Sequence, residues 1–362
     1  MRLALISHHR IVEGEGVSAK LIRTAGCWRR LGHEVALLEL PTGRIVELEH
    51  PGVATVEAPP RTRLGWIVRH QRWFSNATSV LCDLRPDAAF IRQGPWCPAF
   101  EGLLGRIPTI FEINSDPARE LARRSRTAAA YWRWTWPRLA ARAAGFNAVT
   151  SELLPRGVEI PSMVVANSVE VPATPPTREI PDGPPVVVMP IGSPSAWHGV
   201  DRVLRIAQQV PEAIFRLIGA PAETAPANVE FVPRMGEAAL RDELSRCRIG
   251  LASLAMERAG LREACPLKSR TMIAAGLPIV YGYEDPDLAA DTRFAIRIDF
   301  ARDGLDAAVE AVRSLLETTR RDPGIHDEAW RFARDRLGVG VKEHRRLQFI
   351  ADLIGDGGSR VP

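Results

Sequence analysis

The chain has 362 residues, of which 46% are hydrophobic and 25% are charged, with a formal net charge of +4 and a sequence pI near 9.0. No apolar run approaches the roughly 18–20 residues of a membrane-spanning helix, so the composition favours a soluble globular protein of about two domains. Five widely spaced cysteines without a CxxC pair indicate neither a zinc site nor a disulfide framework.

The first half of the chain alternates short aliphatic runs with amphipathic segments. The runs "RLALIS", "HEVALLEL", "DAAFIR", "IPTIFEI" and "FNAVTS" predict strands, and helices are expected over 17–31 and 66–84. This rhythm predicts a parallel, doubly wound sheet. The apolar stretch at the N-terminus is too short for the core of a signal peptide, so we expect a cytoplasmic protein.

A glycine-containing turn, "HHRIVEGEGVSAK", connects the first expected strand to the first expected helix. Gly14 and Gly16 leave room for backbone amides at the helix start to approach a phosphate or a sugar. The alternative is a flexible connection that carries two acids, Glu13 and Glu15.

A basic aromatic segment, Arg119–Ala144, holds seven Arg and three alternating Trp. Arg and Trp on a helix are typical of a face that lies on an anionic membrane. Alternate spacing spreads the three Trp around a helix, so the alternative is that some pack inward or line a pocket. No nucleic-acid recognition motif accompanies the Arg excess, and we expect no nucleic-acid partner.

A proline-rich stretch, "EVPATPPTREIPDGPP", separates the two halves and indicates an interdomain linker. We therefore predict an N-terminal domain over 1–170, a linker over 171–185 and a C-terminal domain over 186–362. The second half repeats the strand–helix alternation, through "PPVVVMPIG", "AIFRLIG", "NVEFV", "RIGLASL" and "LPIVYG". Two amphipathic helices are expected after residue 326 and can cross back to the first domain.

The turn "IGSPSAWHGVDRVL" opens the second half. Gly192, Ser193 and the following amides lie between a strand and a helix, where they can bind a phosphate. His198 can add a donor or a partial charge. The alternative is that Trp197 packs against the helix and His198 only caps it.

A third segment, "GLREACPLKSRTMIAAGLPIVYG", contains a helix bounded by Pro266 and Gly276. Glu263 precedes this helix and can accept hydrogen bonds from sugar or ribose hydroxyls. Lys268 lies on its first turn and can reach a diphosphate. The alternative is a solvated loop acid and a surface cation.

Together these motifs, with "LGHEVALL", "AVTSELL" and "VVANSVEV", resemble the large family of retaining glycosyltransferases with the GT-B fold. The resemblance implies two Rossmann-like domains that face each other across a cleft. It also implies transfer of a sugar from a nucleotide-diphosphate donor to a hydroxyl acceptor, with no metal and no other cofactor. The acceptor would be a glycan, a lipid-linked glycan or a small molecule.

The resemblance assigns Glu263 and Lys268 as catalytic residues. The donor-binding set is Gly192, Ser193, His198, Leu267 and Thr271. Thr271 occupies the position of the family's second Glu, while Ser193 and His198 replace an Arg and a Lys that hold the diphosphate. Asn167 matches an Asn at the domain hinge. The acceptor-side residues are Gly14, Glu15, Gly16, Glu112 and Asn114.

We therefore expect a cytoplasmic retaining glycosyltransferase of polysaccharide, glycolipid or natural-product biosynthesis, with a peripheral membrane contact through Arg119–Ala144. The replaced residues motivate one alternative, a catalytically impaired protein that binds a nucleotide or a partner enzyme as a scaffold. A GT-B epimerase is a weaker alternative, because the acidic and His groups that it would need are not evident.

Overall fold

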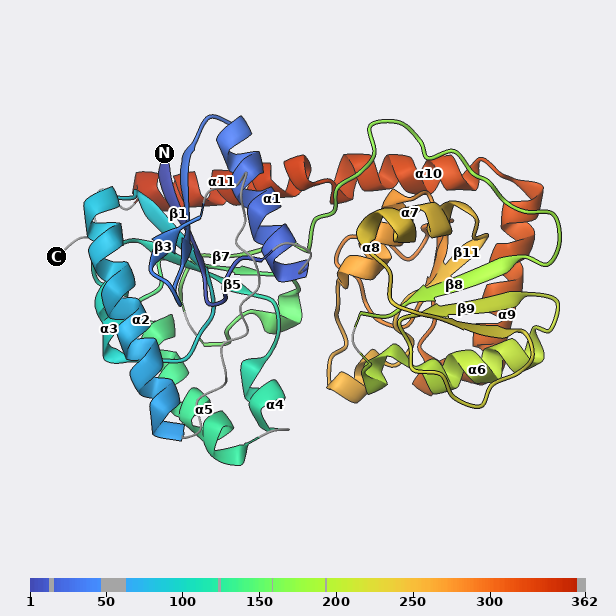
Figure 1. The fold of residues 1–362 in the computed structure, drawn as a ribbon, viewed down its shortest axis with the longest axis horizontal. Coiled ribbons are helices and arrows are strands. Elements are labelled where there is room, and N and C mark those ends of the chain that lie inside the picture. The colour runs from blue at the N-terminus through green and yellow to red at the C-terminus, as the bar shows by residue number, and fades with distance from the viewer. Residues whose placement is uncertain (13–15, 47–62, 123–124, 158, 193, 357–362) are drawn as a thin grey trace. The chain divides into compact units, whose positions relative to one another are not determined.

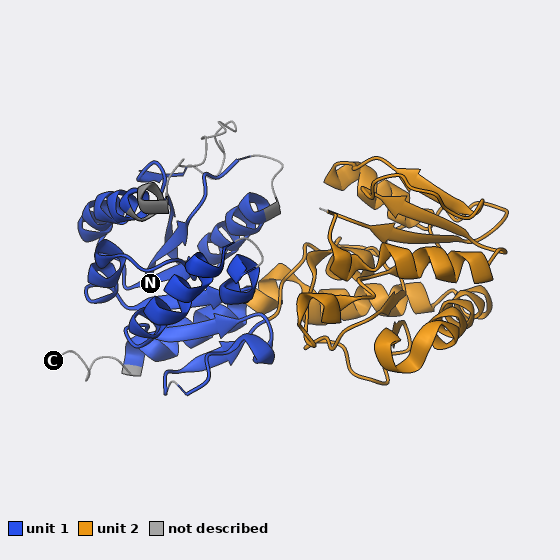
Figure 2. Cartoon of the chain, turned by 90° about the horizontal axis from the view of Figure 1, so that it is seen from below, with its two compact units in different colours: residues 1–165, 343–362 blue, residues 166–342 orange. Residues whose placement is uncertain are grey.

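The computed structural model describes residues 1–12, 16–46, 63–122, 125–157, 159–192 and 194–356 (Figure 1). The chain divides into unit 1, Met1–Val165 with Glu343–Pro362, and unit 2, Ala166–Lys342 (Figure 2). Each unit holds one sheet of almost entirely parallel strands, which confirms the predicted α/β class with two parallel sheets. Among the described residues, no helix combines the length and the apolar character needed to cross a bilayer.

The sheet of unit 1 has the order β3-β2-β1-β4-β5-β6-β7, and all its pairs are parallel except β2 with β3. Its central strands are aliphatic because helices cover both faces of a parallel sheet. In β1, Leu3 and Leu5 pack into one core, and Ala4 and Ile6 pack into the other. The strands are β1 (Arg2–Ser7), β2 (Glu34–Glu39), β3 (Arg44–Ile45), β4 (Ala88–Arg92), β5 (Thr109–Ile113), β6 (Gly145–Ala148) and β7 (Ser162–Val164).

Helices cover both faces of this sheet. Trp28 of α1 and Ile350 of α11 are buried in one core, whereas Phe74 of α2 and Phe100 of α3 stack at 4.1 Å in the other. The C-terminal helix α11 is fixed to unit 1 by Glu343, whose carboxylate accepts a 2.9 Å hydrogen bond from the Trp28 indole. The helices are α1 (Gly16–Arg30), α2 (Arg63–Leu84), α3 (Pro98–Leu104), α4 (Pro117–Ala122), α5 (Arg126–Ala140), the short η1 (Ser151–Leu153) and α11 (Val339–Asp356).

The sheet of unit 2 has the order β10-β9-β8-β11-β12-β13 and is parallel throughout. This is the strand order of a dinucleotide-binding sheet, with the first strand at the centre. Its core is a single apolar cluster that includes every residue of β8 except Pro190. The strands are β8 (Val186–Pro190), β9 (Ile214–Ile218), β10 (Val229–Val232), β11 (Ile249–Leu251), β12 (Ile279–Tyr281) and β13 (Ala295–Arg297).

The helices of unit 2 alternate with these strands. The longest, α9, departs from helical geometry at Gly304, where φ is 80°. The helical segments are η2 (Ala196–His198), α6 (Val200–Gln209), α7 (Glu237–Ser245), η3 (Met256–Ala259), α8 (Leu267–Ala274), α9 (Phe300–Arg321), α10 (Ile325–Phe332) and the π-helical η4 (Ala333–Leu337).

Candidate functional site

The strand order of unit 2 reverses between β8 and β11. From β8 the sheet continues through β9 to β10 on one side, and β11 begins the other side. Ligands of doubly wound sheets bind outside the carboxyl ends of the strands at this point. Gly192 follows β8 there, and Ser253 follows β11. The expected donor-binding turn therefore lies where this fold binds ligands.

The turn after β8 packs against the turn after β11. Gly199, between η2 and α6, has a φ of 74°, in the left-handed region that favours glycine. His198 is buried, with Nδ1 3.2 Å from the Ser253 hydroxyl, and its carbonyl accepts a hydrogen bond from the Leu254 amide. His198 thus joins the two turns. Ser193, the other residue expected to replace a cation, lies outside the described residues.

Lys268, on the first turn of α8, reaches the turn after β8. A Cβ placed on Gly192 would lie 3.1 Å from the Lys268 ammonium, so the glycine leaves space for this side chain. The ammonium is shielded from solvent and has no hydrogen-bond partner among the described residues. Burial, together with the positive charge of Arg234, lowers the pKa of Lys268 to about 8. A buried cation without a partner indicates a site for an anion.

Arg270, a residue of α8, ties this helix to neighbouring segments. Its guanidinium is fully buried and pairs with Asp285 and, at 2.9 Å, with Asp287. Asp287 in turn pairs with the buried Lys342. These four side chains balance in charge, and they connect α8 to the segment after β12 and to the start of α11. Lys268 therefore projects from a helix that is held rigidly.

Glu263 lies five residues before Lys268, in the segment between η3 and α8. It forms an isolated parallel bridge with Glu284, in which the Ala264 amide donates to the Glu284 carbonyl at 2.9 Å. The Glu284 amide donates back to the Arg262 carbonyl, also at 2.9 Å. The Glu263 side chain is partly buried. Its backbone is thus fixed at the approach to α8.

The remaining expected donor-site residues lie on or beside α8. The sequence predicts Pro266 as the first helical residue, but the helix begins one residue later, at Leu267, and Pro266 is its N-cap. The Thr271 hydroxyl donates a 3.0 Å hydrogen bond to the Leu267 carbonyl, so it can only accept a bond from a ligand. Asn167 donates its side-chain amide to the Cys265 carbonyl at 3.0 Å, which ties the start of unit 2 to the segment before α8.

The expected acceptor-side residues belong to unit 1. Glu112, at the carboxyl end of β5, is buried, and its carboxylate contacts the Lys20 ammonium at 2.6 Å and the Asn114 amide at 2.8 Å. Burial raises the pKa of Glu112, but Lys20, Arg346 and these hydrogen bonds outweigh burial and lower it to about 2. Glu112 is therefore an ionised, internally paired group. Gly16 begins α1, whereas Gly14 and Glu15 lie outside the described residues.

The described part of the basic aromatic segment includes the end of α4 and all of α5. Trp132 is buried, and its ring stacks on that of Trp136 at 5.5 Å against the core of unit 1. Trp134 is 62% exposed, with the Arg138 guanidinium 4.6 Å from its ring centre. Trp132 and Trp136 thus pack inward, which is the alternative that their alternate spacing in the sequence left open.

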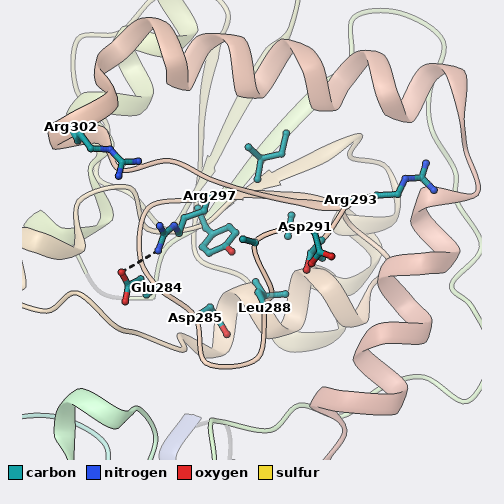
Figure 3. Close-up of a pocket in the computed structure, with 12 residues that line it drawn as sticks. Glu284, Asp285, Leu288, Asp291, Arg293, Arg297 and Arg302 are labelled. Carbon is teal, nitrogen blue, oxygen red and sulfur yellow. Dashed lines mark ion pairs between the residues drawn. The ribbon is translucent and has the colours of Figure 1, made fainter.

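A cavity of about 640 Å³ opens elsewhere in unit 2, beside β12, β13 and the start of α9 (Figure 3). Several of its charged side chains are paired: Arg297 contacts Glu284 at 3.3 Å, and Arg293 contacts Asp322 at 2.8 Å. It contains none of the residues predicted from the sequence. Its lining is Tyr281, Glu284, Asp285, Leu288, Ala290, Asp291, Thr292, Arg293, Ala295, Ile296, Arg297 and Arg302.

Sequence reasoning missed Arg234, whose charge acts on Lys268. The available signal was its position directly after the run "NVEFVP", which predicts a strand end at the ligand-binding edge of the sheet. Sequence reasoning also missed the group of four paired side chains formed by Arg270, Asp285, Asp287 and Lys342. Within the described residues, no group of three or more His, Cys, Asp or Glu side chains is arranged to hold a metal ion.

No protein-family model and no curated protein matches this chain. The structure is similar to that of a sucrose-phosphate synthase from Thermosynechococcus elongatus, with a TM-score of 0.72, 12% identity and coverage of 98% of this chain and 99% of that one. It is also similar to the lipopolysaccharide outer core galactosyltransferase WaaB, with a TM-score of 0.67, 11% identity and coverage of 97% and 99%. For Anabaena HepE in complex with UDP-glucose, the TM-score is 0.63 and the identity is 13%, with coverage of 98% of this chain and 100% of that one.

These likenesses extend over nearly the whole of each chain, although the identities are low. The shared feature is therefore the fold. The chain has the GT-B fold that the resemblance in its sequence predicts.

Proposed function

We propose that this chain is a glycosyltransferase that moves a sugar from a nucleotide-diphosphate donor, bound by unit 2, to a hydroxyl acceptor. The observation that carries the proposal is the Lys268 ammonium, which is buried and lacks a partner among the described residues beside Gly192. A diphosphate would supply the missing anion at the edge where parallel sheets bind ligands. The similarity to HepE in complex with UDP-glucose supports a donor of this class.

In this proposal each side chain near α8 has a distinct part. Lys268 and the amide near Gly192 stabilise the charge that grows on the departing diphosphate, and Glu263 orients the sugar by accepting hydrogen bonds from its hydroxyls. Leu267 and Thr271 lie beside the nucleotide, where the Thr271 oxygen accepts a bond from ribose. Ser193 and His198 complete the turn. The hinge role of Asn167 belongs to the same proposal.

We also propose that transfer retains the anomeric configuration. The bond from the anomeric carbon to the diphosphate oxygen breaks, a bond to the acceptor oxygen forms on the same face, and the acceptor proton passes to the leaving phosphate. The reaction as proposed needs no metal and no cofactor. The acceptor class, a pathway in polysaccharide, glycolipid or natural-product biosynthesis, cytoplasmic location and membrane contact through Arg119–Ala144 stay predictions.

A thermal-shift screen with UDP, GDP, ADP, dTDP, CMP and their common sugar conjugates tests the proposal. We expect one nucleoside diphosphate to raise the melting temperature, because a ligand that binds only the folded state stabilises it. The matching sugar conjugate then enters a transfer assay, with product configuration read by NMR. Binding without transfer or hydrolysis would support the scaffold alternative. No shift with any compound would refute the proposal.

Glu263→Gln is expected to lower turnover at least about tenfold while changing nucleotide affinity much less, because the carboxylate is assigned to the sugar. Turnover and the dissociation constant for the nucleoside diphosphate would be measured on the same preparation. Glu237→Gln changes an exposed residue at the start of α7; it is the matched control and should behave as wild type. Near wild-type turnover in Glu263→Gln would show that the sugar lies elsewhere.

Diphosphate affinity is expected to fall as the pH rises through about 8. The pKa of Lys268 is about 8, so the side chain is a cation below this pH and loses its charge above it. Titrations between about pH 7.5 and about pH 9.5 would show this decline, because a terminal phosphate with a second pKa of about 6 has lost nearly all of its last proton over that range. Lys268→Arg stays charged throughout and should give a flat profile. The same slope in both proteins would exclude Lys268 as its source.

A further inference from the structure

Three neighbouring strands of unit 2 end side by side, and each is followed by a residue near the candidate anion site. The Ile191 amide donates to the Ile218 carbonyl at 2.7 Å, and the Gly219 amide donates to the Val232 carbonyl at 2.8 Å. The turns after β8, β9 and β10 are therefore in register. Arg234 follows β10 by two residues and belongs to the third of these turns.

Gly219 brings Arg234 close to the turn after β8. A Cβ on Gly219 would lie 2.4 Å from the Ile191 carbonyl oxygen and 3.7 Å from the Arg234 Cβ. Ile191 directly precedes Gly192, beside which the Lys268 ammonium lies. Arg234 and Lys268 thus approach the end of β8 from two different elements.

The two cations lack the carboxylate partners that several arginines of unit 2 have. Arg216 pairs with Glu230 at 2.7 Å, and Arg258 pairs with Asp201 at 2.7 Å. Among the described residues, Arg234 forms no ion pair, and Lys268 has no hydrogen-bond partner. Two like charges placed together without an acid repel each other, and an anion between them turns that repulsion into attraction.

We propose that Arg234 is the second phosphate-binding cation of the donor site, acting with Lys268 on the diphosphate group of a nucleoside diphosphate. This inference rests on the proposed function and deepens it. The segment Ile191–Gly199 contains no Lys or Arg, so the turn that usually binds phosphate supplies no permanently charged side chain. Arg234 supplies a permanent positive charge from the turn after β10 instead. Its planar guanidinium can donate two parallel hydrogen bonds to phosphate oxygens, whereas Lys268 acts as a point charge.

The positions of the two cations predict different contributions. The Lys268 ammonium is shielded from solvent, whereas Arg234 is exposed. Salt screens exposed charges much more than buried ones. The part of the affinity that Arg234 contributes should therefore weaken with added salt, while the part from Lys268 persists.

Titration calorimetry of the full chain with inorganic pyrophosphate, UDP and UMP tests the proposal. R234Q is expected to weaken binding of pyrophosphate and UDP about tenfold and to weaken UMP binding much less, because the substitution removes charge-assisted hydrogen bonds to the diphosphate. R234K should recover part of the loss. R241Q, an exposed arginine of α7 that pairs with Glu237 at 3.6 Å, is the matched control and should bind as wild type.

The outcomes separate this inference from the proposed function. If R234Q binds pyrophosphate and UDP within about twofold of wild type while K268M does not bind them, Arg234 has no phosphate role and the proposed function stands. If R234Q weakens UMP as much as UDP, Arg234 acts on another part of the nucleotide and the diphosphate assignment is wrong. If the wild-type chain binds neither pyrophosphate nor any nucleoside diphosphate, the proposed function fails and this inference fails with it.

Discussion

Lys268→Met is expected to lower nucleoside-diphosphate affinity and turnover at least about tenfold without lowering the free energy of unfolding. A buried charge that lacks a partner destabilises the folded state, because desolvation is not offset by an ion pair. The Lys268 ammonium is in this position, beside Gly192. Methionine keeps much of the side-chain volume and removes the charge. Loss of binding together with equal or greater stability is the signature of a functional cation.

Lys342→Met is the matched control for this variant. Lys342 is also buried, but its ammonium pairs with Asp287. The same substitution there removes a partnered charge and leaves a carboxylate uncompensated, so it should lower stability. Urea unfolding and nucleotide titration of both variants would be compared. If Lys268→Met lost stability as Lys342→Met does, or bound nucleotide as wild type, Lys268 would be a structural residue.

Much of the fold is predictable from the sequence because the central strands of both sheets are buried on both faces. Runs such as "RLALIS" and "PPVVVMPIG" therefore consist almost entirely of apolar residues. Among the elements that the prediction lacks, β7 and β13 have three residues each. Such short strands depend on tertiary contacts more than on local pattern. The helix α9 is different, because it has 22 residues and buries Ala308, Val309 and Val312 on one face, so a local pattern was present in the sequence.

The candidate site was predictable only in part. Lys268 follows a proline at a helix start, directly after the expected ligand-binding edge, and local sequence is enough to single it out. The position of Arg234 near the candidate anion site becomes apparent only in the folded chain, where β10 pairs with β9 and Gly219 allows the turns to approach each other. The partners of Arg270 lie 15 and 17 residues away, on a segment with no regular pattern. Pairing over such separations is a property of the folded chain.

Arg270→Met is expected to lower the free energy of unfolding by about 3–5 kcal/mol. Arg270 and Asp285 are fully buried, and Lys342 and Asp287 complete a group with two positive and two negative charges. Burial disfavours the charged form of Arg270, but Asp285 and Asp287 outweigh it and raise its pKa. Without the guanidinium, two buried carboxylates face a single ammonium. Urea unfolding followed by circular dichroism would measure the loss.

The combined variant Arg270→Met/Asp285→Asn separates the charge imbalance from the loss of packing. The double substitution makes the charges of the group equal again. Asparagine keeps the side-chain oxygen that accepts a 3.0 Å hydrogen bond from the backbone amide of Asp287. Most of the lost stability should return, because the main cost in the single variant is an unpaired buried charge. Arg320→Met, which breaks an exposed pair with Glu317, should leave the unfolding curve unchanged. A combined variant no more stable than Arg270→Met would show that packing around the guanidinium, and not charge balance, holds α8 in place.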